Sequence, residues 1–276
     1  MLPSFSADTD LAGIKLLATD MDLTLLHDDK SMPAGLDERI DALEERGILF
    51  CAASGRPVPA LRQAFPRAWE RMGIIADNGA SVHYRGKAIY KSLIDVDLYH
   101  ELIDRVIEDG RGVPVLCCFE EAYVLERDRA HRDELGIYYK RINYVEDFSR
   151  VAAESNKVSI LCPDWNSEQL FNEVFEPEFG SRLYVTCAGG EWIDFMNLGV
   201  DKGTGMRRLT SHLGVELADV AACGDTYNDI PMLDIVGHSF LVANAAEHME
   251  RHARFRCPSN NDDGVLAVID AILAAK

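Results

Sequence analysis

Two aspartates, Asp20 and Asp22, stand two residues apart in the pentapeptide DMDLT, directly after the apolar run at residues 14–18. A short apolar run of this kind is typical of a buried strand in a parallel sheet. Ligands bind at the open carboxyl edge of such a sheet, so a strand that ends in paired acids marks a place for chemistry. One carboxylate could attack phosphorus while the other handles the proton.

Two more apolar runs end in polar turns that contain glycine. The run at residues 48–53 is followed by Ser54, Gly55 and Arg56, and the run at residues 220–223 is followed by the hexapeptide GDTYND. Together with the first run, they predict three buried strands that end in polar turns.

A lysine between the second and third of these runs adds a positive charge. Lys202 lies in the segment VDKGTG, and residues 204–213 after it are predicted to form a helix. The chain carries a net charge of -18. A site for a phosphorylated ligand must therefore create its own positive field from a metal ion, Lys202, Arg56 and backbone N–H groups.

With these four motifs in this order, the chain resembles the haloacid dehalogenase superfamily of phosphotransferases, and within it the Cof-like subfamily with a large α/β cap of type C2B. The resemblance extends to the segments DNGA, NA and NDDGV, which begin at Asp77, Asn244 and Asn261. It covers essentially the whole core, whereas the cap is recognised by its position more than by its sequence.

One residue departs from the family pattern. The family usually has glycine between the second aspartate and the threonine of the first motif, and Leu23 stands there in this chain. If that position needs a backbone angle that only glycine adopts readily, the turn must differ locally. A bulky residue that faces the cap could instead shape the substrate pocket.

The resemblance implies a role for each charged residue of the motifs. Asp20 would be the nucleophile that forms an aspartyl-phosphate intermediate. Asp22 would protonate the leaving group and then deprotonate the hydrolytic water, while Lys202 would offset the negative charge of the acids. A Mg²⁺ cofactor would be held by Asp20, the backbone carbonyl of Asp22 and Asp225, and Asp229 would orient the site or bind through water.

A further set of polar residues is expected to contact the phosphate or the rest of the substrate. These residues are Ser54, Gly55, Arg56, Asn78, Lys202 and Asn228. Two of them keep an alternative interpretation, because Ser-Gly and Asn-Gly are both common turn dipeptides. Ser54 could be a simple turn cap. Asn78 could hydrogen-bond the substrate or a nearby catalytic turn, or it could serve only its own turn. Arg56 is expected to contact the substrate or the cap and not to take part in catalysis.

Apolar strand-like runs alternate with helical patterns at both ends of the chain, which favours an α/β fold with a Rossmann-like, doubly wound parallel sheet. The first helix is predicted over residues 33–46, where Leu36, Ile40 and Leu43 follow helical spacing. Gly47 is expected to end it.

After residue 80 the pattern changes to short strands with two helical stretches, which is typical of an inserted α+β domain. The predicted strands lie at residues 88–91, 113–118, 122–125, 157–162 and 182–186, and the helices at residues 97–108 and 167–175. We therefore assign residues 1–82 and 192–276 to the catalytic core and residues 83–191 to the cap that sets substrate specificity. Linkers at residues 83–86 and 197–199 would form a hinge.

Composition indicates a cytoplasmic enzyme. The net charge of -18 argues against nucleic-acid binding, which needs a basic face. No apolar stretch approaches the roughly 20 residues that span a bilayer. The first ten residues carry no basic side chain, whereas a signal peptide begins with a basic region.

The seven cysteines form no C-x-x-C pair, which favours reduced thiols. Membrane partners are not expected, and either a monomer or a homodimer is compatible with the sequence.

The motifs and the resemblance together predict a Mg²⁺-dependent phosphoric monoester hydrolase that acts on a small phosphorylated metabolite, with a sugar phosphate as the best candidate. A phosphomutase with the same core chemistry is the first alternative. It would keep Asp20 and Asp22 and return the phosphoryl group to the sugar. The second alternative is a regulatory protein that binds a phosphorylated ligand without turnover. The intact set of acids speaks against that alternative.

Overall fold

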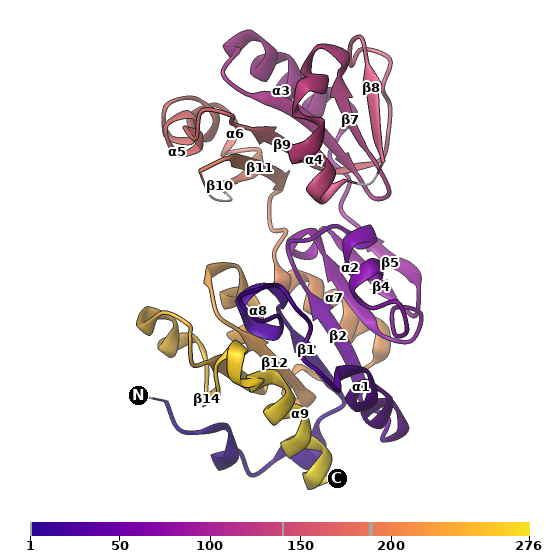
Figure 1. The fold of residues 1–276 in the computed structure, drawn as a ribbon, viewed down its shortest axis with the longest axis vertical. Helices are drawn as coiled ribbons and strands as arrows, with labels where there is room; N and C mark the ends of the chain where they lie inside the picture. The colour runs from indigo at the N-terminus through magenta and orange to yellow at the C-terminus, as the bar shows by residue number, and fades with distance from the viewer. Residues whose placement is uncertain (1, 140, 188–189) are drawn as a thin grey trace. The chain divides into compact units, whose positions relative to one another are not determined.

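The chain folds into two compact units, as the computed structural model shows (Figure 1). The model describes residues 2–139, 141–187 and 190–276. The core unit contains the chain up to Arg56 together with Leu61–Tyr90 and Asp201–Lys276. The inserted unit contains Pro57–Ala60 and Lys91–Val200. Each unit has its own sheet and its own hydrophobic core.

The core unit is built on an eight-stranded sheet with the order β14-β13-β12-β1-β2-β3-β4-β5. Its strands are β1 (Leu16–Thr19), β2 (Leu49–Ala53), β3 (Gly73–Ala76), β4 (Ser81–Tyr84), β5 (Lys87–Lys91), β12 (Val220–Gly224), β13 (His238–Val242) and β14 (Phe255–Cys257). The strands from β14 to β3 pair in parallel, and β4 pairs antiparallel to β3. All four residues of β1 are buried, as expected for a central strand with both faces covered.

The helices of the core unit are α1 (Leu36–Glu45), α7 (Lys202–Leu213), α8 (Ile230–Leu233) and α9 (Gly264–Ala275), and α2 (Val58–Ala64) follows β2. Helices α1 and α9 pack against each other, as do α7 and α8. The predicted apolar stripe of α1 is confirmed, because Leu36, Ile40 and Leu43 are all buried. Each such side chain stabilises the fold by about 1.5–3 kcal/mol. Gly47 follows the helix with a left-handed φ of 71°.

The inserted unit carries a six-stranded sheet with the order β10-β11-β9-β6-β7-β8. Its strands are β6 (Val113–Cys118), β7 (Ala122–Leu125), β8 (Ile142–Val145), β9 (Ser155–Leu161), β10 (Leu183–Cys187) and β11 (Trp192–Asn197), and its helices are α3 (Val96–Asp109), α4 (Arg132–Tyr138), α5 (Ser167–Leu170) and α6 (Glu176–Phe179). Neighbouring strands are antiparallel except for β7 and β8. Helix α3 packs on β6 and β9, with Tyr99 and Leu102 fully buried.

The predicted domain boundaries at residues 83 and 191 need correction. Strand β4 continues the core sheet, with Ile74 of β3 opposite His83, so the residues predicted as the first linker end a core strand and turn back toward β5. Strand β11 pairs with both β9 and β10, so residues 192–197 belong to the inserted sheet and the core does not resume there. The chain returns to the core unit at Asp201.

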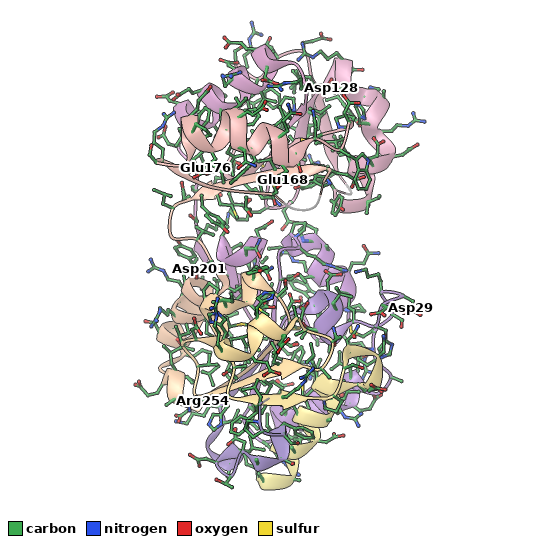
Figure 2. The ribbon with its side chains drawn as sticks, turned by 90° about the vertical axis from the view of Figure 1, so that its left-hand side faces the viewer. Asp29, Asp128, Glu168, Glu176, Asp201 and Arg254 are labelled. Carbon is green, nitrogen blue, oxygen red and sulfur yellow. The ribbon has the colours of Figure 1, made fainter. Side chains whose placement is uncertain are left out.

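Acidic side chains lie on the surface of both units (Figure 2). Asp29 of the core unit and Glu168 and Glu176 of the inserted unit are exposed. All seven cysteines have free thiols. Among the described residues, no helix is long and apolar enough to cross a bilayer.

Candidate active site

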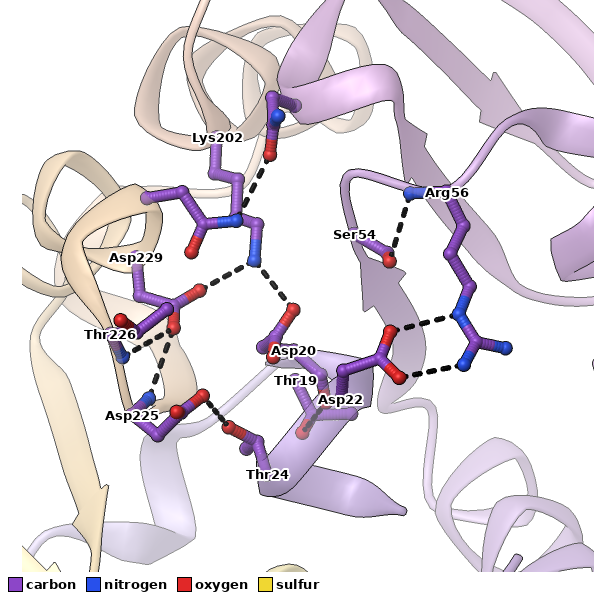
Figure 3. Close-up of polar contacts among 12 residues, drawn as sticks. Thr19, Asp20, Asp22, Thr24, Ser54, Arg56, Lys202, Asp225, Thr226 and Asp229 are labelled. Carbon is purple, nitrogen blue, oxygen red and sulfur yellow. Dashed lines mark hydrogen bonds and ion pairs between the residues drawn. The ribbon is translucent and has the colours of Figure 1, made fainter. Parts of the chain in front are cut away.

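The nucleophile candidate stands at the carboxyl end of the central strand. Asp20 follows β1 and is only 5% exposed, and its N–H donates to the carbonyl of Cys223 on the neighbouring β12 over 3.0 Å. The turn Met21–Leu25 carries the chain away from the sheet directly afterwards. A buried strand with partners on both sides therefore fixes where this carboxylate points (Figure 3).

Lys202 is fully buried and joins two carboxylates. Its ammonium nitrogen lies 2.6 Å from Oδ1 of Asp20 and 2.6 Å from Oδ1 of Asp229 (Figure 3). It is the first residue of α7, where the helix dipole disfavours a positive charge, so the two carboxylates must compensate. Burial alone would lower the pKa of Lys202, but both ion pairs oppose that effect and hold the pKa above its ordinary value.

The turn after β12 supplies two more acids. Asp229 uses both of its oxygens: Oδ1 accepts from Lys202, and Oδ2 accepts from the N–H groups of Asp225 and Thr226 over 3.0 and 3.2 Å. Asp225 is 8% exposed, and its Oδ1 accepts a 2.7 Å hydrogen bond from the hydroxyl of Thr24. Asp229 therefore holds the turn after β12 and Lys202 together.

The glycine before Asp225 is required by this close packing. A Cβ atom added to Gly224 would lie 2.7 Å from Cβ of Asp229, a distance that real side chains do not tolerate. In GDTYND, the glycine is thus needed because no side chain fits beside Asp229, and the aspartate supplies the carboxylate. Thr24, which sequence reasoning did not assign to the site, is the last residue of the DMDLT motif and ties the first turn to this one.

The acids of this cluster have the properties of a site for a divalent cation. Asp20, Asp225 and Asp229 each offer a carboxylate oxygen, and these oxygens lie within 4.8 Å of one another. When all three carboxylates are ionised, the single ammonium of Lys202 leaves an excess of two negative charges in a buried site. Oxygen ligands of this kind suit a hard cation such as Mg²⁺.

The pKa values of Asp20 and Asp225 show that the ionised forms of these two acids are unfavourable in the buried cluster. Burial raises the pKa of Asp20 to about 7, although the ammonium of Lys202 opposes the rise. Burial likewise raises the pKa of Asp225 to about 6, and repulsion from Asp229 adds to the effect. A bound cation would remove this penalty, so the residues present fit the predicted metal.

Asp22 faces a different set of partners from those of Asp20. Its two oxygens accept from Nη2 and Nε of Arg56 over 2.7 and 2.9 Å, and Oδ1 also accepts from Lys30 over 3.1 Å (Figure 3). Burial would raise the pKa of Asp22, but these bonds outweigh it and lower the pKa. The carboxylate of Asp22 is therefore an ionised partner of Arg56 and lies outside the cluster of Asp20, Asp225 and Asp229.

Lys30 was not found by sequence reasoning. It belongs to the loop after the first motif and adopts a left-handed φ of 67°. The same loop is tied to the segment after β14, since Asp28 accepts from the side-chain amides of Asn260 and Asn261 over 2.9 and 2.8 Å. Only this tertiary arrangement brings Lys30 to Asp22, so no sequence motif predicts the contact.

The remaining predicted residues also lie near these turns. Ser54 is buried, and its Oγ accepts from the N–H of Arg56 over 3.1 Å, as a turn cap would. The side-chain amide of Asn228 donates to Oδ1 of Asn78 over 3.1 Å. Gly55 lies directly against the side chain of Asn78. The structure thus brings the turns after β2, β3 and β12 into contact with one another.

Leu23 stands at a backbone position of the kind that favours glycine. Leu23 itself adopts the left-handed conformation, with a φ of 62°. Its carbonyl accepts a 2.7 Å hydrogen bond from the side-chain amide of Asn244, and its side chain is 43% exposed. A leucine in this conformation costs about 1–2 kcal/mol relative to glycine, and the bond to Asn244 helps to hold it.

Comparisons with known proteins agree with this geometry. Residues 17–269 match the family model of the haloacid dehalogenase-like hydrolases. The chain belongs to this family. Over 266 residues it is 31% identical to the 5-amino-6-(5-phospho-D-ribitylamino)uracil phosphatase YbjI of Escherichia coli, an alignment that covers 95% of this chain and 97% of the relative. The HMP-PP phosphatase of an Enterobacter species is 24% identical over 232 residues, or 84% of this chain and 85% of the relative.

Solved structures share the fold of this chain. SMU.1108c of Streptococcus mutans aligns with a TM-score of 0.83 and 26% identity over 95% of this chain and 99% of its own. A haloacid dehalogenase-like hydrolase of Bacteroides thetaiotaomicron aligns with a TM-score of 0.81 and 21% identity over 94% and 99% of the two chains. The predicted superfamily and Rossmann-like α/β fold are confirmed, and so is the predicted class of enzyme, a phosphatase.

Proposed function

We propose that this phosphatase depends on Mg²⁺ and hydrolyses a small phosphorylated metabolite through a phosphoryl group carried on Asp20. The observation that supports this most strongly is the buried ion bridge of Lys202. Its ammonium lies 2.6 Å from both Asp20 and Asp229, within a cluster of three carboxylates that carries two excess negative charges when all of them are ionised. Such a cluster suits a divalent cation and a phosphoryl group better than it suits an empty, purely structural role.

The first step requires Asp20 to attack phosphorus while the ester oxygen leaves. A carboxylate oxygen of Asp20 forms the new bond to phosphorus, and the bond from phosphorus to the ester oxygen breaks. Mg²⁺, when held by Asp20 and Asp225, supplies positive charge for the phosphoryl oxygens. Lys202 keeps Asp20 aligned and reduces the repulsion between the attacking anion and the phosphate.

Asp22 is assigned the proton transfers. In the structure its carboxylate is held by Arg56 and Lys30, and its pKa is lowered. To protonate the leaving oxygen, Asp22 must turn away from Arg56, and the loss of those hydrogen bonds raises its pKa toward a value at which it can carry a proton. Asp22 then takes a proton from the water that hydrolyses the phosphoryl group on Asp20.

The substrate is proposed to be a phosphate ester of a sugar or sugar alcohol. The name of the Escherichia coli relative describes a phosphoribityl compound, in which the phosphate is carried by a sugar-alcohol chain. The name of the Enterobacter relative describes a different phosphorylated compound, so the family changes its leaving group on one core. We assign selectivity for the leaving group to the inserted unit.

The proposal is tested by phosphate release from sugar phosphates, 5-amino-6-(5-phospho-D-ribitylamino)uracil and p-nitrophenyl phosphate. Each compound is assayed with Mg²⁺ and with EDTA, in the wild type and in Asp20→Asn. Asp10→Asn is a matched control, because Asp10 is exposed and lies outside the site. We expect release that needs Mg²⁺, disappears in Asp20→Asn and survives in Asp10→Asn. Isomerised ester without free phosphate would instead show a phosphomutase.

A further inference from the structure

The turn after β3 has an unusual backbone. Asp77, Asn78 and Gly79 are consecutive residues in the left-handed region, with φ values of 48°, 53° and 100°. Two of them are not glycine, and each such residue costs about 1 kcal/mol. A turn with such a backbone persists only where neighbouring segments hold it. The contacts of the turn therefore indicate its role.

The backbone of this turn holds the loop that carries Ser54. The N–H of Asn78 donates to the carbonyl of Ser54 over 3.0 Å, and the N–H of Asp77 donates to the carbonyl of Arg56 over 3.1 Å. The side chain of Asn78 covers the same loop, because a Cβ atom added to Gly55 would lie 3.3 Å from both its Oδ1 and its Nδ2. Residues of the left-handed turn thus make both backbone bonds to this loop.

The same turn also reaches the segments that carry Lys202 and Asp229. A Cβ atom added to Gly79 would lie 2.1 Å from the carbonyl oxygen of Asp201, the residue that caps the helix of Lys202. On the other side, Oδ1 of Asn78 accepts from the side-chain amide of Asn228, which precedes Asp229. One short turn thus touches three segments of the proposed phosphoryl site.

We propose that Asn78 is a positioning residue, which sets the distance between the Ser54 loop and the Asn228 turn through the acceptor oxygen of its side chain. The proposal rests on the proposed function, because these two segments hold the groups that would bind the phosphate. Of the roles expected for Asn78, the proposal chooses the hydrogen bond to a nearby turn of the site over a contact with the substrate. A displacement of about 1 Å between such groups lowers a rate by up to about a hundredfold.

Two substitutions of Asn78 separate positioning from substrate contact. Asn78→Gly keeps the left-handed backbone and removes the side chain. Asn78→Asp keeps an acceptor oxygen of the same shape but adds a negative charge. If the side chain positions Asn228, kcat/KM falls about 10- to 100-fold in Asn78→Gly and is largely retained in Asn78→Asp. If the amide binds the phosphate directly, Asn78→Asp is the worse variant, because its carboxylate repels the phosphate.

Removal of the donor provides the matched control. Asn228→Ala breaks the same hydrogen bond from the other side, so the double variant with Asn78→Gly should lose no more activity than the more damaged single variant. Independent losses that multiply would overturn the proposal, as would full activity in Asn78→Gly. A melting temperature within a few degrees of the wild type shows that the Gly variant is folded.

A second readout does not depend on turnover. Calorimetric titration with inorganic phosphate, in the presence of Mg²⁺, should show a dissociation constant weakened about tenfold or more in Asn78→Gly and Asn228→Ala, and no further in the double variant. If the wild type binds phosphate but hydrolyses no ester, the proposed function fails while the role of Asn78 is still measured. Equal phosphate affinity in the wild type and Asn78→Gly would contradict the positioning role.

Discussion

Replacement of Asp225 by asparagine should stabilise the metal-free protein. Asparagine has the same shape, and its side-chain oxygen can still accept the hydrogen bond from Thr24. The change removes a carboxylate whose pKa is raised to about 6 by burial and by its neighbour Asp229. At pH 8 that carboxylate is ionised in the folded state against an unfavourable environment, and its neutral isostere does not pay this penalty.

The size of the effect follows from the shift in pKa. Asp225 has a pKa of about 6 in the folded chain against the ordinary value of 3.8. Each unit of pKa corresponds to about 1.4 kcal/mol, and the other acids of the cluster share part of the penalty, so we expect a stabilisation of about 1–3 kcal/mol at pH 8. Below the unfolded pKa both states hold the proton and the effect vanishes. It grows as the pH rises from about 4 to about 6 and is constant above.

Urea denaturation in EDTA measures this difference. The free energy of unfolding is compared at pH 5 and pH 8 for the wild type, Asp225→Asn and the control Asp10→Asn. We expect a gain in Asp225→Asn that is about half as large at pH 5, and little change in the control. Added Mg²⁺ should stabilise the wild type and have little effect on Asp225→Asn. A variant that is less stable than the wild type at pH 8, or a difference that does not depend on pH, would refute the reasoning.

Two further changes test the charged partners of the site. Lys202→Met leaves Asp20 and Asp229 buried without their cation. It should lower the free energy of unfolding, measured with urea at pH 8, by about 3–5 kcal/mol. A loss under about 1 kcal/mol would contradict the ion bridge. Arg56→Met removes two hydrogen bonds from Asp22 and should raise the pKa of Asp22. Carboxyl NMR titration in EDTA measures this pKa. An unchanged pKa would show that the pair of Arg56 and Asp22 does not form in solution.

Much of the core could be predicted from the sequence because its signals are local. Buried parallel strands give continuous apolar runs, and α1 gives a clear helical spacing, so both were found. The helix predicted at residues 33–46 lies at Leu36–Glu45. In the insert, the strand predictions at residues 113–118 and 122–125 match β6 and β7. The structure brings the motif residues together because three strand ends and one helix start carry them.

The domain boundaries could not be predicted in the same way. The residue pattern of an antiparallel strand is the same whether it pairs with the core sheet or with the inserted sheet. The predicted boundaries therefore divided β4 and assigned β5 and β11 to the wrong unit. The choice is made by pairing between residues far apart in the sequence. For example, Ile193 of β11 lies opposite Ile160 of β9. Lys30 was missed for the same reason, since it approaches Asp22 through a loop that distant asparagines hold in place.

The most direct test of the central claim is to look for the phosphoryl group on Asp20. Asp22→Asn should accept the phosphoryl group slowly and release it more slowly still, so the covalent form should accumulate when this variant is mixed with substrate and Mg²⁺ and then quenched with acid. Mass spectrometry is expected to find the mass of one phosphoryl group on the peptide that contains Asp20, and not in the double variant that also carries Asp20→Asn. Phosphate release within one turnover, with no phosphoryl group on Asp20 at any time, would contradict the account.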